Sequence, residues 1–263
     1  MNKIITSINY CPVKSISFQS IDTCKIKKNI GIVGDRIFAF AKDLELNKAH
    51  LFEKNPEERK GKWNKILTLK NSPFLNKYNF LLNKNELILM IKDKKILKID
   101  INELSERQLL TNKIIELENS LKEPIILMKN EEFPFFDTTI SNKVDFINSV
   151  SLLNLQSIND FQKKIDKKIE ISRFRGNICV DGIKPWAERE WIGKIIKINN
   201  ASFKVEKNIP RCIAINLEPQ TDDNSLNLLQ SLKKTYGHFE MGIYLSALED
   251  GKINCGDQFE VMS

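Results

Sequence analysis

The chain has 263 residues, a formal net charge of +7 and a hydrophobic content of 41%. This length fits one large domain or two small ones, and this hydrophobic content is typical of a folded protein and excludes a largely disordered one. No stretch approaches the roughly 18–20 apolar residues that span a bilayer, and the start of the chain turns polar too early for a signal peptide. We therefore expect a cytoplasmic protein without a membrane span.

The excess positive charge has two possible uses. The lysines are spread along the chain and no nucleic-acid-binding motif accompanies them, so we expect no nucleic-acid partner. A basic pocket for a small anionic cofactor accounts for the charge better. The five cysteines, Cys11, Cys24, Cys179, Cys212 and Cys255, are widely spaced, which excludes a disulfide framework and a structural zinc site.

The first half of the chain is predicted to be mostly β-structure. Apolar patterning predicts strands at 3–10, 16–27, 36–42, 64–70, 78–83, 86–92 and 95–99. Apolar side chains spaced three and four residues apart then predict a helix over 103–121, which Asn102 would cap.

The second half is predicted to mix strands with two helices. The helices are expected at 151–165, beginning at Ser151, and around 224–235. Strands are expected within 125–150 and at 177–181, 194–206, 212–217, 239–248 and 252–262. The pattern predicts a mostly β protein of the α+β class, with two domains at 1–124 and 125–263.

One cysteine has a basic neighbourhood. Cys212 follows Arg211 directly, and Lys207 lies close in sequence, at the mouth of a predicted strand. Nearby positive charge favours the thiolate, which is the form that binds metals. The alternative is a buried structural cysteine, because free cysteine is among the most buried residue types.

Several basic residues could bind an anion. Arg173 and Arg175 would point the same way on an extended chain, and arginine suits phosphate and planar heterocycles. Arg36 follows a glycine-bounded turn, while Lys14 and Ser15 follow the first strand and could donate to an anion. A solvated edge and an ordinary β-turn remain open as alternatives.

These signals occur in the order of a known family. The chain resembles MOSC-domain proteins that carry a MOSC N-terminal β-barrel domain, in particular the mitochondrial amidoxime-reducing components and their bacterial counterparts. The residues that carry the resemblance are Tyr10-Cys11-Pro12-Val13-Lys14-Ser15, Gly31-Ile32-Val33-Gly34-Asp35-Arg36, Phe136-Asp137-Thr138-Thr139, Ser151-Leu152, Arg173-Phe174-Arg175-Gly176-Asn177, Glu188 with Trp191, Ile192-Gly193, Pro210-Arg211-Cys212 and the segment from Gly251 to Asp257.

The resemblance implies an N-terminal β-barrel-like domain at 1–124, a MOSC β-barrel domain at 125–263, and a molybdenum cofactor (molybdopterin) between them. Cys212 would be the thiolate ligand of the metal and the catalytic residue, since a soft thiolate suits molybdenum. The residues that match cofactor-lining positions are Lys14, Ser15, Arg36, Thr138, Thr139, Arg175, Asn177, Pro210 and Arg211.

Three departures from the family matter. Ile209 replaces a second cysteine, so Cys212 would be a single ligand, and Gly176 stands where proline is usual. The segment 44–100 matches the family poorly, which leaves the substrate open. Clustered cysteines for an iron–sulfur cluster and a pyridoxal phosphate domain are both missing from this sequence, so neither group is expected, and electrons would come from a separate ferredoxin-, flavodoxin- or cytochrome-type protein.

Three functions stay open at this point. The first is a molybdenum-dependent oxidoreductase that reduces small N-oxygenated compounds, such as amidoximes, by oxo transfer. The second is a carrier of the cofactor or of sulfur, with a persulfide on Cys212 and no reductase turnover. The third is a binding module without chemistry, whose arginines hold another phosphate or a nucleic acid.

Overall fold

A computed structural model describes residues 3–121, 123–136 and 149–262. Its largest sheet has eight strands in the order β16-β12-β13-β14-β10-β11-β1-β2, so the first strand of the chain lies among strands of the second half. These strands are β1 (Ile4–Tyr10), β2 (Gln19–Ile21), β10 (Val150–Asn154), β11 (Ile178–Asp181), β12 (Ile195–Ile198), β13 (Ala201–Pro210), β14 (Glu240–Ala247) and β16 (Phe259–Met262).

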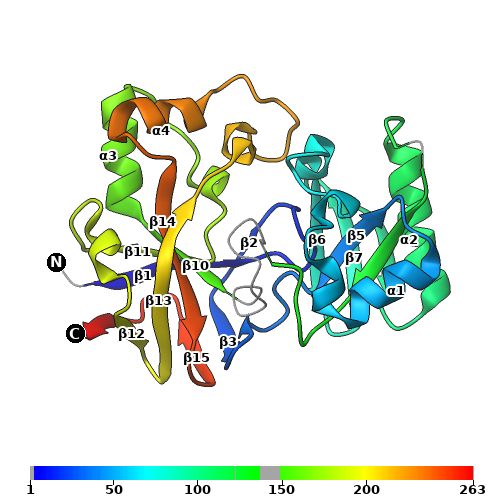
Figure 1. Ribbon diagram of the computed structural model, residues 1–263, viewed down its shortest axis with the longest axis horizontal. Helices are drawn as coiled ribbons and strands as arrows, with labels where there is room; N and C mark the ends of the chain where they lie inside the picture. Colours follow the sequence, from blue (N-terminus) through cyan, green and yellow to red (C-terminus); the bar gives the residue numbers. More distant parts are fainter. Residues whose placement is uncertain (1–2, 122, 137–148, 263) are drawn as a thin grey trace.

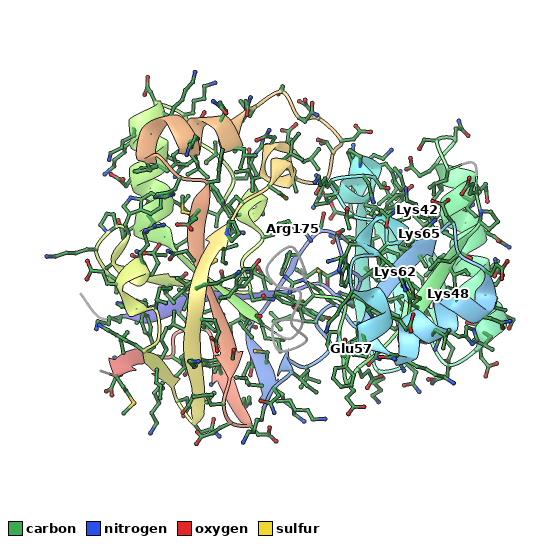
Figure 2. The ribbon with its side chains drawn as sticks, viewed as in Figure 1. Lys42, Lys48, Glu57, Lys62, Lys65 and Arg175 are labelled. Carbon is green, nitrogen blue, oxygen red and sulfur yellow. The ribbon has the colours of Figure 1, made fainter. Side chains whose placement is uncertain are left out.

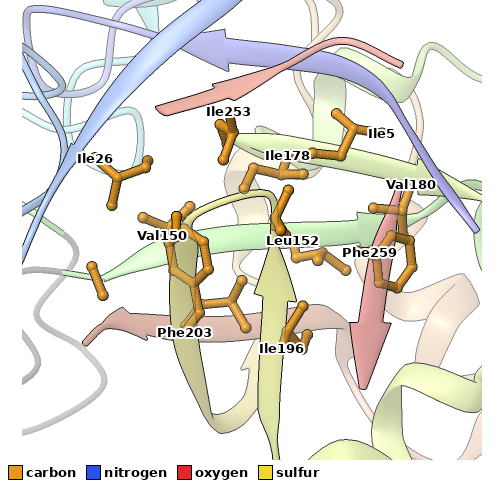
Figure 3. Packing of buried hydrophobic residues seen from close by; sticks show 14 of the residues in the cluster. Ile5, Ile26, Val150, Leu152, Ile178, Val180, Ile196, Phe203, Ile253 and Phe259 are labelled. Atoms are coloured by element: carbon orange, nitrogen blue, oxygen red, sulfur yellow. The ribbon is translucent and has the colours of Figure 1, made fainter. Parts of the chain in front are cut away.

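This sheet, together with the helices α3 (Leu155–Ile165) and α4 (Leu228–Tyr236), forms what we call the C-terminal lobe (Figure 1). A small sheet of β15 (Gly251–Asn254), β3 (Thr23–Lys27) and β4 (Gly31–Ile32) completes it. The alternation of buried and exposed residues along β3 and β12 is the period-two pattern of a half-buried strand. Figure 3 shows the resulting core, in which Ile5 and Ile178 from neighbouring strands pack near Leu152.

The N-terminal lobe lies beside it (Figure 1). It contains the pair of β5 (Phe38–Lys42) with β9 (Ile125–Lys129), and a meander of β6 (Tyr78–Asn83), β7 (Glu86–Ile91) and β8 (Lys94–Asp100). Two helices, α1 (Leu46–Lys54) and α2 (Leu104–Leu117), belong to this lobe. Short 3-10 helices occur at Pro56–Arg59, Trp63–Lys65, Pro73–Lys77, Ile171–Phe174, Ala187–Trp191 and Ile213–Asn216.

The mostly β prediction is confirmed. The pairing of the described strands is an open order and does not close into a barrel, although an isolated bridge joins Ile4 to Gln258, the residue before β16. Among the described residues, no helix is both long and apolar enough to cross a membrane.

Five local predictions are wrong. Residues 64–70 form the end of a 3-10 helix, a single β-bridge at Ile66 and a turn instead of a strand, and residues 213–216 form another 3-10 helix instead of a strand. Helix α1 was not expected, because its polar sequence buries only Ala49 and Phe52. Helix α3 begins at Leu155, since Asn154, and not Ser151, accepts the hydrogen bond from the Gln156 amide that caps it. Likewise, Glu103 precedes α2 at the position expected for Asn102.

Strand pairing crosses the predicted domain boundary in both directions. β1 pairs with β2 and β11 in the C-terminal lobe, whereas β9, which follows residue 124, pairs with β5 in the N-terminal lobe. The division at 124 and 125 stays a prediction, but the two lobes of the structure are each built from both halves of the sequence.

A buried carboxyl group links β10, α3 and the 3-10 helix Ala187–Trp191. Glu188 is fully buried, and its Oε2 accepts hydrogen bonds from Asn154 Nδ2 at 2.8 Å and from Ser157 Oγ at 3.0 Å. The Ser157 hydroxyl also approaches Oε1 at 2.8 Å. Burial raises the pKa of Glu188, and the hydrogen bonds from Asn154 and Ser157 act against that rise.

We predict that Glu188→Gln changes how stability depends on pH. Since the pKa of Glu188 is higher in the folded chain than in the unfolded chain, protonation favours folding. The wild type should therefore gain stability relative to Glu188→Gln as the pH falls through the folded-state pKa of Glu188 toward the unfolded value of about 4.3, and lose it as the pH rises. Urea unfolding at several pH values measures this difference.

The matched control is Glu249→Gln, because Glu249 is exposed and accepts one hydrogen bond from Ser202 at 2.9 Å. Its stability difference should vary little with pH. A Glu188→Gln difference that stays constant, or that grows in the opposite direction, would contradict the prediction.

Candidate functional site

Four segments meet between the two lobes. They are the loop after β1, the link between β4 and β5, the turn before β11 and the end of β13. Arg175, from the turn before β11, lies between the lobes in Figure 2. The chain reverses sharply here, since Ser15, Arg36 and Arg175 all adopt left-handed backbone conformations, with φ of +64°, +53° and +48°.

Asp35 is the buried centre of these segments. Its Oδ1 accepts the backbone N–H of Cys11 at 2.9 Å, and its Oδ2 accepts Arg36 Nη1 at 2.7 Å and Asn177 Nδ2 at 3.1 Å. Burial raises the pKa of Asp35, while Arg36 and the hydrogen bonds from Cys11 and Asn177 act to lower it. One carboxyl group thus connects three of the four segments.

Asn177 extends this network to β10. Its Oδ1 accepts hydrogen bonds from the Ser151 hydroxyl at 2.8 Å and the Ser151 amide at 3.1 Å. Its Nδ2 donates to Asp35 and to the Asn9 carbonyl at 3.1 Å. Both ends of the Asn177 amide are therefore engaged within the protein, which suits a positioning role.

Two phenylalanine rings lie against the arginine side chains of the site. The Arg36 guanidinium lies 4.0 Å from the Phe136 ring centroid and 5.0 Å from that of Phe18, and Arg175 lies 4.8 Å from Phe18. Lys14 Nζ donates to the Phe136 carbonyl at 3.0 Å. Stacking on a ring holds a guanidinium group without neutralising it. Arg36 also pairs with the Asp35 carboxylate, whereas Arg175 forms no ion pair among the described residues.

Arg175 has few partners for a half-buried cation. Within the described part of the chain its guanidinium donates one hydrogen bond, from Nη2 to the Ile16 carbonyl at 2.7 Å, and forms no ion pair. Burial lowers the pKa of Arg175, while Cys11 and Cys212 act to raise it. The influence of Cys212 shows that its thiol lies within electrostatic reach of Arg175.

Cys212 is exposed at the end of β13, while its neighbour Arg211 is firmly anchored. Arg211 donates from Nε to the Met241 carbonyl at 2.9 Å and from Nη1 to the Phe174 carbonyl at 2.7 Å. Ile209, at the position of the missing second cysteine, is buried and cannot present a ligand. The turn after β13 thus carries one accessible thiol next to an anchored arginine.

A second thiol of the site has no predicted role. Cys11 is fully buried, and burial raises its pKa, with Asp35 acting in the same direction and Arg36, Arg175 and Lys14 against it. The sequence signal was its place in the Tyr10-to-Ser15 motif, but nothing local distinguished it from a core cysteine. The structure places it beside the cations of the site.

The structure brings together Lys14, Arg36, Arg175, Asn177 and Cys212. Arg211 and Pro210 support the turn that carries Cys212, and Ser15 lies in the sharp bend after Lys14. Thr138 and Thr139 lie outside the described residues. The expectation that Arg173 and Arg175 point the same way is wrong, because the chain there is a 3-10 helix and Arg173 turns to Glu170 and the Asn216 carbonyl.

The structure explains why a glycine stands at position 176. A Cβ atom at this position would lie 2.4 Å from Leu153 Cδ1, well inside van der Waals contact. The departure from proline therefore lets the turn that carries Arg175 and Asn177 approach β10 closely.

Comparison with known proteins matches part of the chain to a domain family. Residues 146–260 match the MOSC domain family. Among solved structures, the chain is similar to the YUAD protein from Bacillus subtilis, at 11% identity over 99% of this chain and 96% of that chain with a TM-score of 0.45. It is also similar to YiiM from Geobacillus stearothermophilus, at 15% identity over 43% and 54% of the two chains with a TM-score of 0.35.

The chain is also similar to parts of two named proteins. The chain is 27% identical to mitochondrial amidoxime reducing component 2 of Bos taurus over 55% of this chain and 45% of that protein. It is 30% identical to the molybdenum cofactor sulfurase of Bombyx mori over 45% of this chain and 14% of that protein. The chain thus spans less than half the length of either relative.

We predict that Asp35→Asn lowers the free energy of unfolding by about 1–3 kcal/mol, because an amide nitrogen would face one of the three buried donors that Asp35 accepts. Asp250→Asn is the matched control, since the exposed Asp250 accepts one backbone N–H, from Lys28 at 2.7 Å. Its change should stay within about 0.5 kcal/mol. Equal losses in the two variants, measured by urea denaturation, would show that the Asp35 network contributes nothing particular.

Proposed function

We propose that this protein binds a molybdenum cofactor through Cys212 and reduces N-hydroxylated compounds. The observation that carries the proposal is an exposed thiol, Cys212, within electrostatic reach of Arg175, a half-buried guanidinium that forms no ion pair with a carboxylate among the described residues. Buried cations call for an anion. The match of residues 146–260 to the MOSC domain family and the names of the relatives support a molybdenum cofactor as that anion.

The residues present fit such a group. A thiolate is a soft ligand that suits molybdenum, and Cys212 offers one at the edge of the cationic region. Arg36, Arg175 and Lys14 would bind the phosphate and the pterin, for which planar guanidinium groups are suited. When bound, the cofactor supplies a metal that exchanges electrons and oxygen with the substrate.

The protein's own part is to position these groups. Arg211 holds the Cys212 turn against the Met241 and Phe174 carbonyls. Asp35 and Asn177 fix Arg36 and the Arg175 turn relative to β1 and β10. Ser15, Pro210, Thr138 and Thr139 remain proposed lining residues.

The substrate class and the electron source rest on similarity. The name of the Bos taurus relative supports an amidoxime or a related N-oxygenated compound as substrate. The electrons would come from a separate one-electron donor protein, and neither an iron–sulfur cluster nor pyridoxal phosphate is required in this chain. A cytoplasmic location remains part of the proposal.

A carrier role is the second candidate. The name of the Bombyx mori relative and the exposure of Cys212 favour it, since an exposed thiol can hold a persulfide that another protein reaches. Intact-mass spectrometry of the freshly purified protein separates the two candidates. Sulfur added at Cys212 supports the carrier, and stoichiometric molybdenum supports the enzyme.

We predict that Cys212→Ser removes molybdenum from protein produced in a host that makes the cofactor, because a hydroxyl group is a poor replacement for a soft thiolate. Cys255→Ser is the matched control, since Cys255 is also exposed and lies away from this site, near the Ile21 carbonyl. Metal analysis should find normal molybdenum in the control. Unchanged molybdenum in Cys212→Ser would refute the ligand assignment.

We also predict that the loaded protein reduces benzamidoxime to benzamidine with reduced methyl viologen as electron donor. Arg175→Gln should lower kcat/KM by roughly tenfold or more, as the loss of a charged hydrogen bond in a dry site does. Product formation can be followed by chromatography. A molybdenum-loaded wild type without turnover would favour the carrier.

A further inference from the structure

Aromatic side chains gather on the C-terminal lobe, away from the cations of the site. Trp186, Tyr236 and His238 are half-buried and in mutual contact, and Phe239 follows with 38% of its surface exposed. Ring centroids are 4.3 Å apart for Trp186 and Tyr236, and 5.9 Å apart for the stacked Tyr236 and His238. We call these four residues the aromatic face. Trp186 has a large aromatic side chain, so its partial exposure calls for a reason.

The aromatic face is connected to the Cys212 turn through the core. Tyr236 contacts Phe161 at 6.1 Å between ring centroids, and Phe161 contacts Phe174 at 6.3 Å. The Phe174 ring lies 5.9 Å from the Arg211 guanidinium, and the Arg211 amide donates to the Phe239 carbonyl at 2.8 Å. Rings at these spacings are in packing contact. An unbroken series of contacts therefore runs from Trp186 to the residue beside Cys212.

Positive charge surrounds the aromatic face. The last turn of α3 carries Lys163 and Lys164, and the last turn of α4 carries Lys233 and Lys234. The two helix ends converge, because Lys164 Nζ lies 4.7 Å from the Tyr236 ring and Lys233 Nζ lies 5.3 Å from the Phe239 ring. Figure 1 shows α3 and α4 side by side. Arg189 lies close enough to His238 to lower its pKa, together with burial and Lys233.

The local carboxylates do not cancel this charge. Asp160 is held by Trp186 Nε1 at 2.8 Å and by the Tyr236 hydroxyl at 2.7 Å, and it lies 3.6 Å from Lys164. Glu240 pairs with Arg189 at 2.7 Å. Lys163 and Lys234 are exposed and are the sequence neighbours of Lys164 and Lys233 in the same helix turns. Lysines at helix C-termini also stabilise the helices, so the charge alone would not indicate a partner. The position of Lys164 and Lys233 over partly exposed aromatic rings does.

We propose that the aromatic face is the docking surface for an acidic one-electron carrier protein that supplies the electrons for the Cys212 site. The inference rests on the proposed function, which requires two electrons and two protons to convert each N–OH group to N–H and water. Transient redox complexes bury small interfaces. They use aromatic contacts at the centre and complementary charge for steering, and the aromatic face offers both.

A second lysine cluster provides the contrast. Figure 2 labels Lys42, Lys48, Lys62 and Lys65 on the N-terminal lobe. Glu58 lies 3.2 Å from Lys62 and 3.8 Å from Lys48, so carboxylates accompany these lysines. This cluster has a comparable density of lysine without the series of aromatic contacts to Arg211, which makes it a suitable control.

The test is binding, independent of catalysis. The probes are a plant-type [2Fe–2S] ferredoxin and a flavodoxin, both acidic, with basic cytochrome c as a negative probe. Dissociation constants for the full-length protein are measured by calorimetry at low ionic strength. The variant Lys163→Glu with Lys234→Glu is compared with Lys48→Glu with Lys62→Glu, after circular dichroism has shown that both are folded.

We expect an acidic carrier to bind the wild type, with affinity that falls as ionic strength rises from about 0.01 to about 0.15 M. The Lys163 and Lys234 variant should bind roughly tenfold or more weakly, and the Lys48 and Lys62 variant within about twofold of the wild type. Equal binding by the two variants, greater loss in the Lys48 and Lys62 variant, or no binding of either acidic carrier overturns the proposal.

Two further measurements separate this inference from the proposed function. Carrier-driven reduction of benzamidoxime should fall in the Lys163 and Lys234 variant, while reduction driven by methyl viologen should not change. Trp186→Leu should slow carrier-driven turnover and spare viologen-driven turnover. If viologen drives no reduction in the wild type, the proposed function fails, and the binding measurements still decide whether the surface accepts an acidic carrier.

Discussion

The site depends on the hydrogen bonds that the buried carboxylate of Asp35 accepts. This carboxylate accepts the Cys11 amide, the Arg36 guanidinium and the Asn177 side chain, so β1, the link before β5 and the turn before β11 have one common anchor. These segments otherwise belong to different parts of the sequence, and Asp35 and Asn177 are 142 residues apart. A carboxylate removed from water is stable only when its acceptors are fully used. The three donors therefore have fixed positions relative to one another.

The sequence indicated many residues of the candidate site, but it did not indicate how their side chains are arranged. The ordered motifs indicated Lys14, Arg36, Arg175, Asn177 and Cys212, and the structure brings these residues together. The sequence could not distinguish side chains that face a ligand from those that support them. Asn177 and Arg211 bind carbonyl groups and neighbouring side chains through contacts that are distant in sequence, and no local pattern reports such contacts.

The fold shows the same limit. Strands with period-two alternation, such as β12 and β6, were predictable because half-burial imposes that period. Residues 64–70 have similar apolar content, yet Ile66, Leu67 and Leu69 are buried in a segment that forms only a single β-bridge and a turn after a 3-10 helix. Helix α1 has few apolar residues and was missed. Burial by tertiary packing overrides local preference at such places.

The two lobes make unequal contributions to the chemistry that we propose. Lys14 and Arg36 stand at the junction of the lobes, where they can face an anionic group, whereas Cys212 and Arg211 belong to the C-terminal lobe with the aromatic face. Arg211 binds the carbonyl of Phe174 and lies over its ring, so the position of the Cys212 turn depends on the same aromatic core that reaches Trp186. In the function that we propose, the metal ligand and the electron-entry surface therefore lie on the same lobe and are joined by one packed core. The same proposal assigns substrate binding to the junction of the lobes and electron supply to the C-terminal lobe.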